Sequence, residues 1–474
     1  MNTKQLKQKI LSLAISGQLV PQDPTDEPAS ELLKRIAAEK TANVPKGKKQ
    51  KITKDTSHYQ QYPPFELPKG WVWCKLGEVF NNMVSTKPKT NPFKYIDINS
   101  IDNKKCKINE VKIINIEDAP SRATRHTETG DILFSMVRPY LRNIALVEEE
   151  DCIASTGFFI CKPNLAMDSK YCYYLMTSDY VVMGLNAFMK GDNSPSINNS
   201  NITSFLFPLP PLAEQGRITQ EVHRLFTLID QLEEDKTALQ QLVTQLKSKI
   251  LNLAIRGQLV PQDVNETPAE ELLKQINPEY KSSGNLHYKN LPKGWAMCKL
   301  GEVCEAERGI TFPSSAKKFQ FEEGTIACLR TANVQELLDI EDLWYIDESY
   351  LKGNKRKYIQ IGDVMMSTAN SRELVGKVSF VRELDKPMSF GGFIMALRAK
   401  GIHSEYLYIV LRTLFLEGYF SKIASQTTNI ANLNTRNLNE IDILLPPLAE
   451  QQRISEKITE LFNIIDTIQN ALNS

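Results

Sequence analysis

The sequence predicts an α+β protein in which two mixed α/β domains are separated by a long antiparallel two-helix coiled coil, with pseudo-two-fold symmetry from a tandem duplication. Three observations lead to this fold class. Three sequence blocks occur twice in the same order, an apolar stripe with heptad spacing follows one of them, and short β-rich runs fill the regions between the blocks.

The repeated blocks define the duplication. LKQKILSLAISGQLVPQD at residues 6–23 returns as LKSKILNLAIRGQLVPQD at residues 246–263, with 15 of 18 positions identical. LPKGWVWCKLGEV from Leu67 returns as LPKGWAMCKLGEV from Leu291, and LPPLAEQGRI from Leu209 returns as LPPLAEQQRI from Leu445. The offsets are 240, 224 and 236 residues, so the two halves of the chain share one frame.

The blocks divide the chain into seven segments in order. The repeated helical segments are residues 1–36, 208–276 and 444–474, the divergent domains are residues 67–207 and 291–443, and the linkers are residues 37–66 and 277–290. Short helices are expected at Pro28 to Ile36 and at Pro268 to Ile276. The first linker carries Lys40, Lys46, Lys48, Lys49, Lys51 and Lys54. Such a loop is either only solvated or contacts phosphates without reading sequence.

A long helix is predicted from about Leu212 to Arg256, with Gly257 as its stop. Its apolar stripe alternates spacings of four and three residues, which is the a/d pattern of a coiled coil. The stripe consists of Ile218, Val222, Leu225, Ile229, Leu232, Leu239, Val243, Leu246, Ile250 and Leu253. The C-terminal segment repeats its first half and the N-terminal segment its second half. We therefore expect both to pack antiparallel on the central helix and the chain ends to meet. The alternative is a set of ordinary helices that face a domain core.

The two divergent domains read as mixed α/β. β-rich runs such as DILFSMV, ASTGFFIC, DVMMSTA and KVSFV alternate with helix candidates at Ser169 to Met183 and Ser404 to Gly418. The two domains share only sparse echoes. These pair Gly130-Asp131-Ile132 with Gly362-Asp363-Val364, and Gly157-Phe158 with Gly392-Phe393.

Composition excludes several classes of protein. The 474 residues include 57 basic and 56 acidic side chains, so the chain lacks the basic excess of a non-specific polyanion binder. No apolar run is long enough to span a bilayer, and the N-terminus lacks the layout of a signal peptide, so a cytosolic protein is expected. The eight cysteines form no CxxC pair and have no histidine at zinc-ligand spacing. We expect reduced thiols that mostly pack, and no metal site.

Motifs for catalysis are missing. The sequence contains no Walker A motif, GxGxxG, HExxH or GxSxG, and no Asn-Pro-Pro-aromatic or Asp-Pro-Pro-aromatic tetrapeptide. The run Glu148 to Asp151 is typical of a solvated turn. The chain is therefore predicted not to be an enzyme.

The paired LPKGW and LPPLAEQxRI blocks, each followed or preceded by long helices, resemble the specificity subunit of type I restriction-modification systems over essentially the whole chain. The resemblance implies two target recognition domains, each reading half of a bipartite asymmetric DNA site, and a coiled coil that sets their spacing. It also implies two methyltransferase subunits and restriction (nuclease-translocase) subunits as partners. S-adenosylmethionine, ATP and Mg would belong to those partners, with no cofactor bound by this chain. A GQLVPQD block before the first domain resembles circularly rearranged members of the family.

Base reading uses bidentate Arg, Asn or Gln side chains, whereas Lys and hydroxyl groups mostly contact phosphates. The DNA-binding candidates in the first domain are Arg122, Arg125, Arg138, Arg142, Lys190 and Asn193. Those in the second domain are Arg330, Asn333, Lys355, Arg356, Lys357, Asn370, Arg372, Thr427, Thr428 and Asn429. The alternative for each is a structural ion pair at the surface. As sets, the loops GDNSPS (residues 191–196) and SQTTNI (residues 425–430) are favoured because they precede the LPPLAEQ blocks in matching places.

Partner docking is assigned to the LPPLAEQ blocks, at Pro210, Pro211, Leu212, Glu214, Gln215, Pro446, Pro447, Leu448, Glu450 and Gln451. Trp71 and Trp295 are expected to pack the domains onto the helices rather than to stack on DNA. Two other functions remain open at this point. One is a coiled-coil scaffold whose variable domains bind proteins, and the other is a silent or shuffling copy of the specificity subunit.

Overall fold

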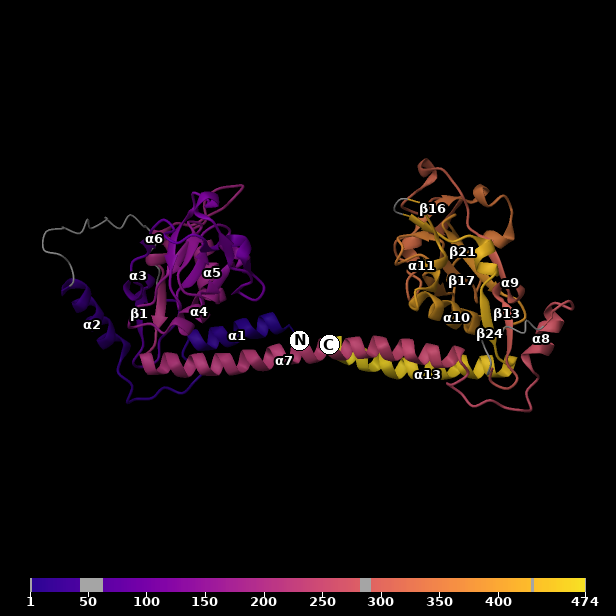
Figure 1. Cartoon of the computed structure of the whole chain (residues 1–474), viewed down its shortest axis with the longest axis horizontal. Helices are drawn as coiled ribbons and strands as arrows, with labels where there is room; N and C mark the ends of the chain where they lie inside the picture. The colour runs from indigo at the N-terminus through magenta and orange to yellow at the C-terminus, as the bar shows by residue number, and fades with distance from the viewer. Residues whose placement is uncertain (1, 43–62, 282–290, 428–429, 474) are drawn as a thin grey trace. The chain divides into compact units, whose positions relative to one another are not determined.

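The computed structural model describes residues 2–42, 63–281, 291–427 and 430–473 (Figure 1). The chain forms two compact units, Met1–Asp235 (unit 1) and Lys236–Ser474 (unit 2), and their boundary falls within the long helix α7 (Leu212–Ile255). Each unit contains one divergent domain. Residues 43–62 of the predicted lysine-rich linker lie outside the described residues.

Unit 1 contains helices, 3-10 turns (η) and strands in an irregular order. Its helices are α1 (Thr3–Ile15), α2 (Ala29–Ala42), α3 (Leu76–Val79), α4 (Ser169–Thr177), α5 (Asp179–Asn186), α6 (Asn199–Thr203) and the first part of α7, and its turns are η1 (Ile98–Ser100), η2 (Ile116–Asp118) and η3 (Pro139–Leu141). Its strands are β1 (Val72–Lys75), β2 (Val84–Ser85), β3 (Phe93–Ile96), β4 (Ile101–Asp102), β5 (Lys107–Ile108), β6 (Lys112–Ile114), β7 (Ala123–Thr127), β8 (Ile132–Ser135), β9 (Ile144–Leu146), β10 (Cys152–Ser155), β11 (Phe158–Cys161) and β12 (Leu206–Leu209).

Unit 2 follows a related order. Its helices are the last part of α7, α8 (Ala269–Ile276), α9 (Leu300–Val303), α10 (Ser404–Leu416), α11 (Tyr419–Ile423), α12 (Thr435–Asn439) and α13 (Leu448–Asn473), and its turns are η4 (Ser314–Ala316), η5 (Thr331–Asn333), η6 (Glu348–Leu351) and η7 (Lys355–Lys357). Its strands are β13 (Ala296–Lys299), β14 (Cys304–Arg308), β15 (Thr325–Leu329), β16 (Trp344–Asp347), β17 (Val364–Ser367), β18 (Ala369–Asn370), β19 (Val378–Phe380), β20 (Met388–Phe390), β21 (Ile394–Ala399), β22 (Ser425–Thr427), β23 (Ile430–Asn432) and β24 (Asp442–Leu445).

The sheets are small and mostly antiparallel, and the described strands of each unit include one parallel pair, β3 with β10 and β15 with β20. In unit 1 the orders are β2-β7-β10-β3-β6 and β11-β8-β9, and in unit 2 they are β14-β21-β17-β19, β16-β15-β20 and β18-β23-β22. In both units the first strand of the domain pairs antiparallel with the last, as β1 with β12 and β13 with β24. Each domain therefore begins and ends at one place, directly before its LPPLAEQ helix. This arrangement confirms the predicted class of two α/β domains on helices.

The long helix and its antiparallel packing are confirmed within each unit. Lys7 of α1 forms an ion pair with Asp230 of α7, while Gln22, farther along the chain, bonds Glu214 near the start of α7. In unit 2, Lys247 of α7 pairs with Asp466 of α13 at 2.6 Å, and Gln262 bonds Glu450 at 3.1 Å. Figure 1 shows α1 along the first part of α7 and α13 along its last part. The predicted meeting of the chain ends involves both units and stays a prediction.

The buried seam is less regular than the heptad pattern predicts. Ile218, Val222, Ile229, Val243 and Ile250 are buried, and the first three share a core with Trp71 and Leu175 of the domain. Leu232, Leu239 and Leu246 are exposed, so a buried seam along the whole stripe is wrong for these residues. The alternative of helices that face a domain core therefore holds in part, because α7 packs on both a helix and a domain.

Two predicted boundaries are wrong for local reasons. α2 runs to Ala42 rather than stopping at Ile36, because residues 37–42 include alanine, glutamate and lysine, which favour helix. The predicted helix Ser169 to Met183 is two helices, α4 and α5. Ser178 between them is extended, and its hydroxyl accepts the N–H of Val181 to cap α5. Gly257 is the predicted stop of α7, with a left-handed φ of +67°.

Of the two sequence similarities between the domains, that of residues 130–132 with 362–364 is structural. That of residues 157–158 with 392–393 is a misalignment. Asp131 pairs with Lys162 at 2.5 Å, and Asp363 pairs with Arg398 at 2.9 Å, in buried and matching positions. The strand registers pair Ser135 with Phe158 and Ser367 with Ile394. Phe158 therefore corresponds to Ile394, and equating it with Phe393 is wrong by one residue. A shift of one residue reverses the face of a strand, and accordingly Phe158 is buried whereas Phe393 is exposed.

The eight cysteines are free, and seven of them are buried, as expected of packing residues. In the part of the chain that the structure describes, no group of three His, Cys, Asp or Glu side chains could hold a metal ion. None of the described helices combines the length and apolar content that a bilayer crossing requires.

Candidate nucleic-acid interface

The three repeated blocks meet at one carboxylate in unit 1. Glu214 is buried, its Oε2 accepts a hydrogen bond from Trp71 Nε1 (2.9 Å), and its Oε1 accepts one from Gln22 Nε2 (3.2 Å). Gln22 Nε2 also donates to the carbonyl of Gly17 at 2.6 Å. A Cβ atom at Gly17 would lie 2.3 Å from Pro68 Cγ, so only glycine fits this crossing. We call Gln22, Trp71 and Glu214 the frame junction of unit 1.

Unit 2 has the same frame junction, formed by Gln262, Trp295 and Glu450. Glu450 accepts hydrogen bonds from Trp295 Nε1 (3.1 Å) and Gln262 Nε2 (3.1 Å). Burial raises the pKa of the Glu214 and Glu450 carboxyls, although their hydrogen bonds to tryptophan and glutamine oppose the rise. The two tryptophans pack the domains onto the helices, as predicted.

The frame junctions correct the assignment of partner docking. Of the ten residues assigned to docking, Leu212 and Leu448 are exposed. The other eight are buried within their own unit, namely Pro210, Pro211, Glu214, Gln215, Pro446, Pro447, Glu450 and Gln451. Gln215, for example, accepts the N–H of Asp168 (2.8 Å) and donates to the carbonyl of Ala166 (2.8 Å). These eight residues hold each domain on its helix and do not form a docking surface.

The loop between β8 and β9 contains two of the four described non-glycine residues of unit 1 that have a positive φ angle. Arg138 and Arg142, on either side of η3, have left-handed φ angles of 47° and 56°. Such angles cost a non-glycine residue roughly 1–2 kcal/mol and are often retained at functional sites. Arg138 is exposed, and its Nη2 donates to the carbonyl of Asn193 at 2.7 Å. The structure thus brings together the predicted Arg138 and the predicted loop at residues 191–196.

Arg142 has a different role from the predicted one. Its Nη1 donates to the carbonyl of Thr177 at 2.7 Å, and its Nη2 forms an ion pair with Asp179. The guanidinium is mostly buried in this anchor and is not available to DNA. Arg142 therefore fixes the loop to α4 and α5, and its assignment as a DNA contact is wrong.

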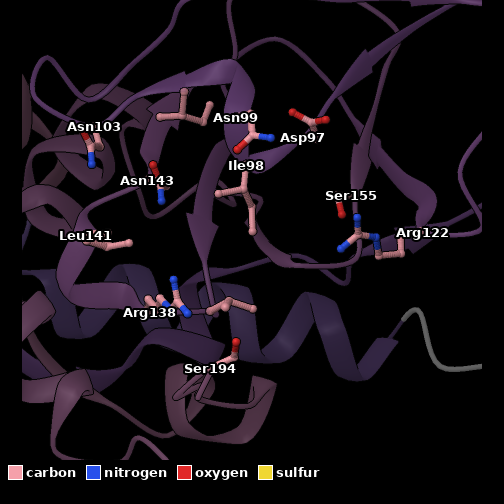
Figure 2. Close-up of a pocket in the computed structure, with 12 residues that line it drawn as sticks. Asp97, Ile98, Asn99, Asn103, Arg122, Arg138, Leu141, Asn143, Ser155 and Ser194 are labelled. Carbon is pink, nitrogen blue, oxygen red and sulfur yellow. The ribbon is translucent and has the colours of Figure 1, made fainter. Parts of the chain in front are cut away.

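A hollow of about 580 Å³ lies beside this loop. Its walls come from residues 97–103, residues 137–143 and the side chains of Arg122, Ser155 and Ser194. Figure 2 shows Arg122, Arg138, Asn99, Asn103 and Asn143 around it. Two exposed arginines that were predicted to contact DNA therefore line the same hollow as three asparagines that were not among the candidates.

The remaining unit 1 candidates have simpler surroundings. Arg125 lies on β7 with a buried Nε that has no hydrogen-bond partner among the described residues. Lys190 is exposed, and its backbone pairs with that of Ser196, which closes the loop at residues 191–196. Asn193 is exposed and contributes its carbonyl to Arg138. These positions are compatible with DNA contact, which stays a prediction.

In unit 2, Arg330 is half-buried and Asn333 is buried. Arg330 forms an ion pair with Asp342, and its guanidinium lies 5.7 Å from the ring centroid of Trp344. Asn333 is completely buried. Its Oδ1 accepts the N–H of Arg330 (2.8 Å), and its Nδ2 donates to the carbonyl of Asp342 (3.0 Å). Asn333 shapes the backbone of η5, so its assignment as a DNA contact is wrong.

The other unit 2 candidates fall into two groups. Lys355 and Arg356 are exposed on η7, where Arg356 pairs with Glu305 at 2.7 Å and Lys357 pairs with Glu307 at 2.6 Å. Asn370 on β18 pairs with Ala431 of β23, which places it beside the predicted loop at residues 425–430. Arg372 is exposed, Thr427 ends β22, and Thr428 and Asn429 lie outside the described residues.

The sequence analysis missed an aromatic and basic surface in unit 2. Lys317 Nζ lies 4.0 Å from the ring centroid of Trp344, and Lys386 Nζ lies 5.7 Å from that of Tyr345. Phe319 and Phe321 are 77% and 69% exposed. The available sequence signal was the run KKFQF at residues 317–321, in which lysines adjoin aromatic residues. The amides at the unit 1 hollow gave no comparable signal.

Comparison with protein families agrees with this architecture. The profile described as "Type I restriction modification DNA specificity domain" matches residues 68–241 and 292–474. Each match begins within an LPKGW block and extends past the following LPPLAEQ helix start, so the family domain occurs twice, once for each divergent domain.

Individual relatives cover nearly the whole chain. The Escherichia coli type I restriction enzyme EcoEI specificity subunit is 27% identical over 99% of this chain and 91% of its own length. The EcoAI specificity subunit of the same organism is 28% identical over 98% and 90%. A chain in a solved structure that describes complex assembly of a type I restriction-modification system has a TM-score of 0.63 at 29% identity. The match covers 86% of this chain and 94% of that chain. The HsdS subunit from Thermoanaerobacter tengcongensis has a TM-score of 0.56 at 28% identity, covering 86% and 93%.

Proposed function

The chain belongs to the DNA specificity family of type I restriction-modification systems, and from that premise we propose that each of its two variable domains reads one half of a bipartite, asymmetric DNA site. Residues 67–207 would read one half-site and residues 291–443 the other. Family members are DNA-recognition subunits without catalysis, and this chain accordingly lacks the motifs of an enzyme.

One observation carries the proposal. The two frame junctions have the same residues and the same hydrogen bonds, whereas the loops of the two domains share almost no sequence. Identical attachments with different exposed side chains suit a protein that presents two unlike reading surfaces to one continuous ligand. A bipartite DNA sequence is such a ligand.

The helix that joins the domains would set the distance between the half-sites. α7 has 44 residues, and at 1.5 Å per residue it is about 65 Å long. In this proposal the antiparallel partners on α7 would stiffen it, and its length would be reflected in the DNA spacer.

The proposed assembly assigns the chemistry to partner chains. Two methyltransferase subunits would use S-adenosylmethionine, and restriction subunits would use ATP and Mg, with no cofactor held by this chain. The complex would act on double-stranded DNA in the cytoplasm. The exposed Leu212 and Leu448, at the starts of α7 and α13, are the positions of the predicted docking set that a partner could reach.

A domain exchange tests the proposal. Residues 291–443 are replaced by those of a relative, and the methylated motif is determined by sequencing DNA modified by the assembled complex. We expect one half-site to change and the other half-site and the spacer to stay. A change in both half-sites, or in neither, contradicts modular reading. Specific binding by the assembled complex that weakens steeply with salt separates DNA reading from a protein-binding scaffold.

A further inference from the structure

Asn143 lines the unit 1 hollow, and its position is fixed by backbone contacts. It immediately precedes β9, and its carbonyl accepts the N–H of Ser135 at 3.1 Å. The preceding residue, Arg142, is left-handed and anchored to Asp179 and to the carbonyl of Thr177. The position of the Asn143 side chain is therefore set by the backbone on both sides.

The Asn143 side chain is largely buried, and its amide, unpaired within the described chain, is open to the hollow. Asn143 is 7% exposed and lines the hollow, yet no hydrogen bond joins its side-chain amide to any residue that the structure describes. Buried polar side chains in native proteins are nearly always hydrogen-bonded, to protein, to water or to a ligand. The free amide therefore points to a polar molecule that enters the hollow.

The rim of the hollow has the charge expected for a nucleic acid. Arg122 is exposed, and its guanidinium has no hydrogen-bond or ion-pair partner in the described chain. Arg138 uses Nη2 for the carbonyl of Asn193. The acidic lining residue, Asp97, is neutralised by Lys112 at 2.6 Å. Two arginines at the rim therefore leave a net positive opening, which attracts a polyanion.

We propose that Asn143 is a specificity-determining residue that reads one base of the half-site assigned to residues 67–207, with Arg122 and Arg138 as the positive rim that brings the DNA to it. This inference rests on the proposed function. An asparagine amide offers one donor and one acceptor side by side, which matches the N6 and N7 edge of adenine. Because Asn143 is only 7% exposed, a base that leaves its amide unpaired is rejected more strongly than at a fully exposed position.

Substitution of Asn143 in the full chain, assembled with its methyltransferase subunits, tests the inference. Asn143→Ala is expected to reduce discrimination at one base pair of one half-site by about ten- to a hundred-fold, measured from methylation of a randomised DNA library. Asn143→Asp, which keeps the shape but removes the donor, is expected to shift the preferred base at that pair toward cytosine. The half-site read by residues 291–443 stays unchanged in both.

Asn164→Ala is the matched control. The Asn164 amide lies away from the hollow and is already used, because its Nδ2 donates to the carbonyl of Glu78 at 3.0 Å. Its loss is expected to lower stability and leave the methylated motif intact. Thermal unfolding of each assembled variant identifies misfolding, and if Asn143→Ala does not assemble, the Asn143→Asp motif decides.

The possible failures are distinguishable. If the wild-type complex methylates a split motif and the Asn143 variants methylate the same motif with the same discrimination, the role of Asn143 is refuted and the proposed function stands. If the wild-type complex itself shows no sequence preference in binding or methylation, the proposed function fails and this inference fails with it.

Discussion

The loops β8–β9 in unit 1 and β17–β19 in unit 2 are built on the same backbone plan and present different side chains. The N–H of Ser135 bonds the carbonyl of Asn143 at 3.1 Å, and the N–H of Ser367 bonds the carbonyl of Lys377 at 2.9 Å. Asn143 and Lys377 are therefore equivalent positions. The left-handed residue before each is Arg142 in unit 1 and Gly376 in unit 2.

The two units accommodate the left-handed residue of this loop in different ways. In unit 1 the left-handed position is held by the Arg142 anchor on Asp179. In unit 2 it is glycine, because a Cβ atom at Gly376 would lie 2.5 Å from the Phe420 side chain. Lys377 donates to Gln335 Oε1 at 3.0 Å, whereas the Asn143 amide has no partner among the described residues. The backbone is retained and the side chain that it presents is changed.

The comparison indicates which positions of the duplication are constrained. Buried pairs that attach a strand or a domain keep their chemistry in both copies, whereas positions facing outward do not. A buried carboxylate that loses its partners is costly, so both copies retain it. An exposed loop carries no such cost and is free to diverge with the ligand.

The largest expected effect is a loss of stability, and it differs between the two buried ion pairs. Asp363→Ala strands the Arg398 guanidinium, which keeps only the carbonyl of Tyr358 at 2.8 Å, and is expected to lower the free energy of unfolding by about 3–5 kcal/mol. Asp131→Ala is expected to cost less, because Lys162 keeps Glu128 at 3.1 Å. Denaturant unfolding measures both, with the exposed Asp385→Ala as control. An equal or larger cost for Asp131→Ala would contradict this reading of the two units.

The frame junctions are expected to behave alike. Glu214→Ala and Glu450→Ala each leave a tryptophan N–H without an acceptor, whereas the glutamine of the junction keeps two backbone carbonyls, at a cost of about 1–3 kcal/mol in the free energy of unfolding. The exposed Glu234→Ala on the same α7 helix is expected to change it by less than about 0.5 kcal/mol. Differential unfolding of the three variants checks this, and a clear inequality between Glu214 and Glu450 would break the equivalence of the junctions.

The remaining expected effect concerns DNA binding by unit 2 rather than stability. Arg330→Ala is expected to relax one base pair of the half-site read by residues 291–443, at a cost of about 1–3 kcal/mol. Lys355→Ala is expected to weaken binding to all sequences alike and to reduce the salt slope by about one. Salt-dependent gel shifts on matched and mismatched sites distinguish them. Altered reading of the other half-site by Arg330→Ala would show that the two domains do not read separately.

Much of the frame was readable from sequence because it depends on repetition and periodicity. The 44 residues of α7 begin at the predicted Leu212 and end one residue before the predicted Arg256. The packing role of Trp71 and Trp295, in the repeated LPKGW blocks, was also predicted. The stripe failed at Leu232, Leu239 and Leu246, because spacing alone does not tell which part of a long helix has a neighbour.

The candidate site was less predictable, because residue type does not report burial. Glutamate and glutamine are usually exposed, so the LPPLAEQ blocks suggested a docking surface, whereas Glu214, Gln215, Glu450 and Gln451 are internal. Arg142 was a predicted DNA contact, whereas its neighbour Asn143 was not among the candidates. The arginine anchors the loop, and the asparagine faces the hollow.

The duplication, the helices that carry it and the family can all be recognised in the sequence, because identical blocks recur at fixed offsets. Which polar side chains hold the frame and which face outward depends on the folded chain. A hydrogen bond such as that from Trp71 to Glu214 joins residues 143 positions apart, and no local pattern records which distant donor a carboxylate will meet.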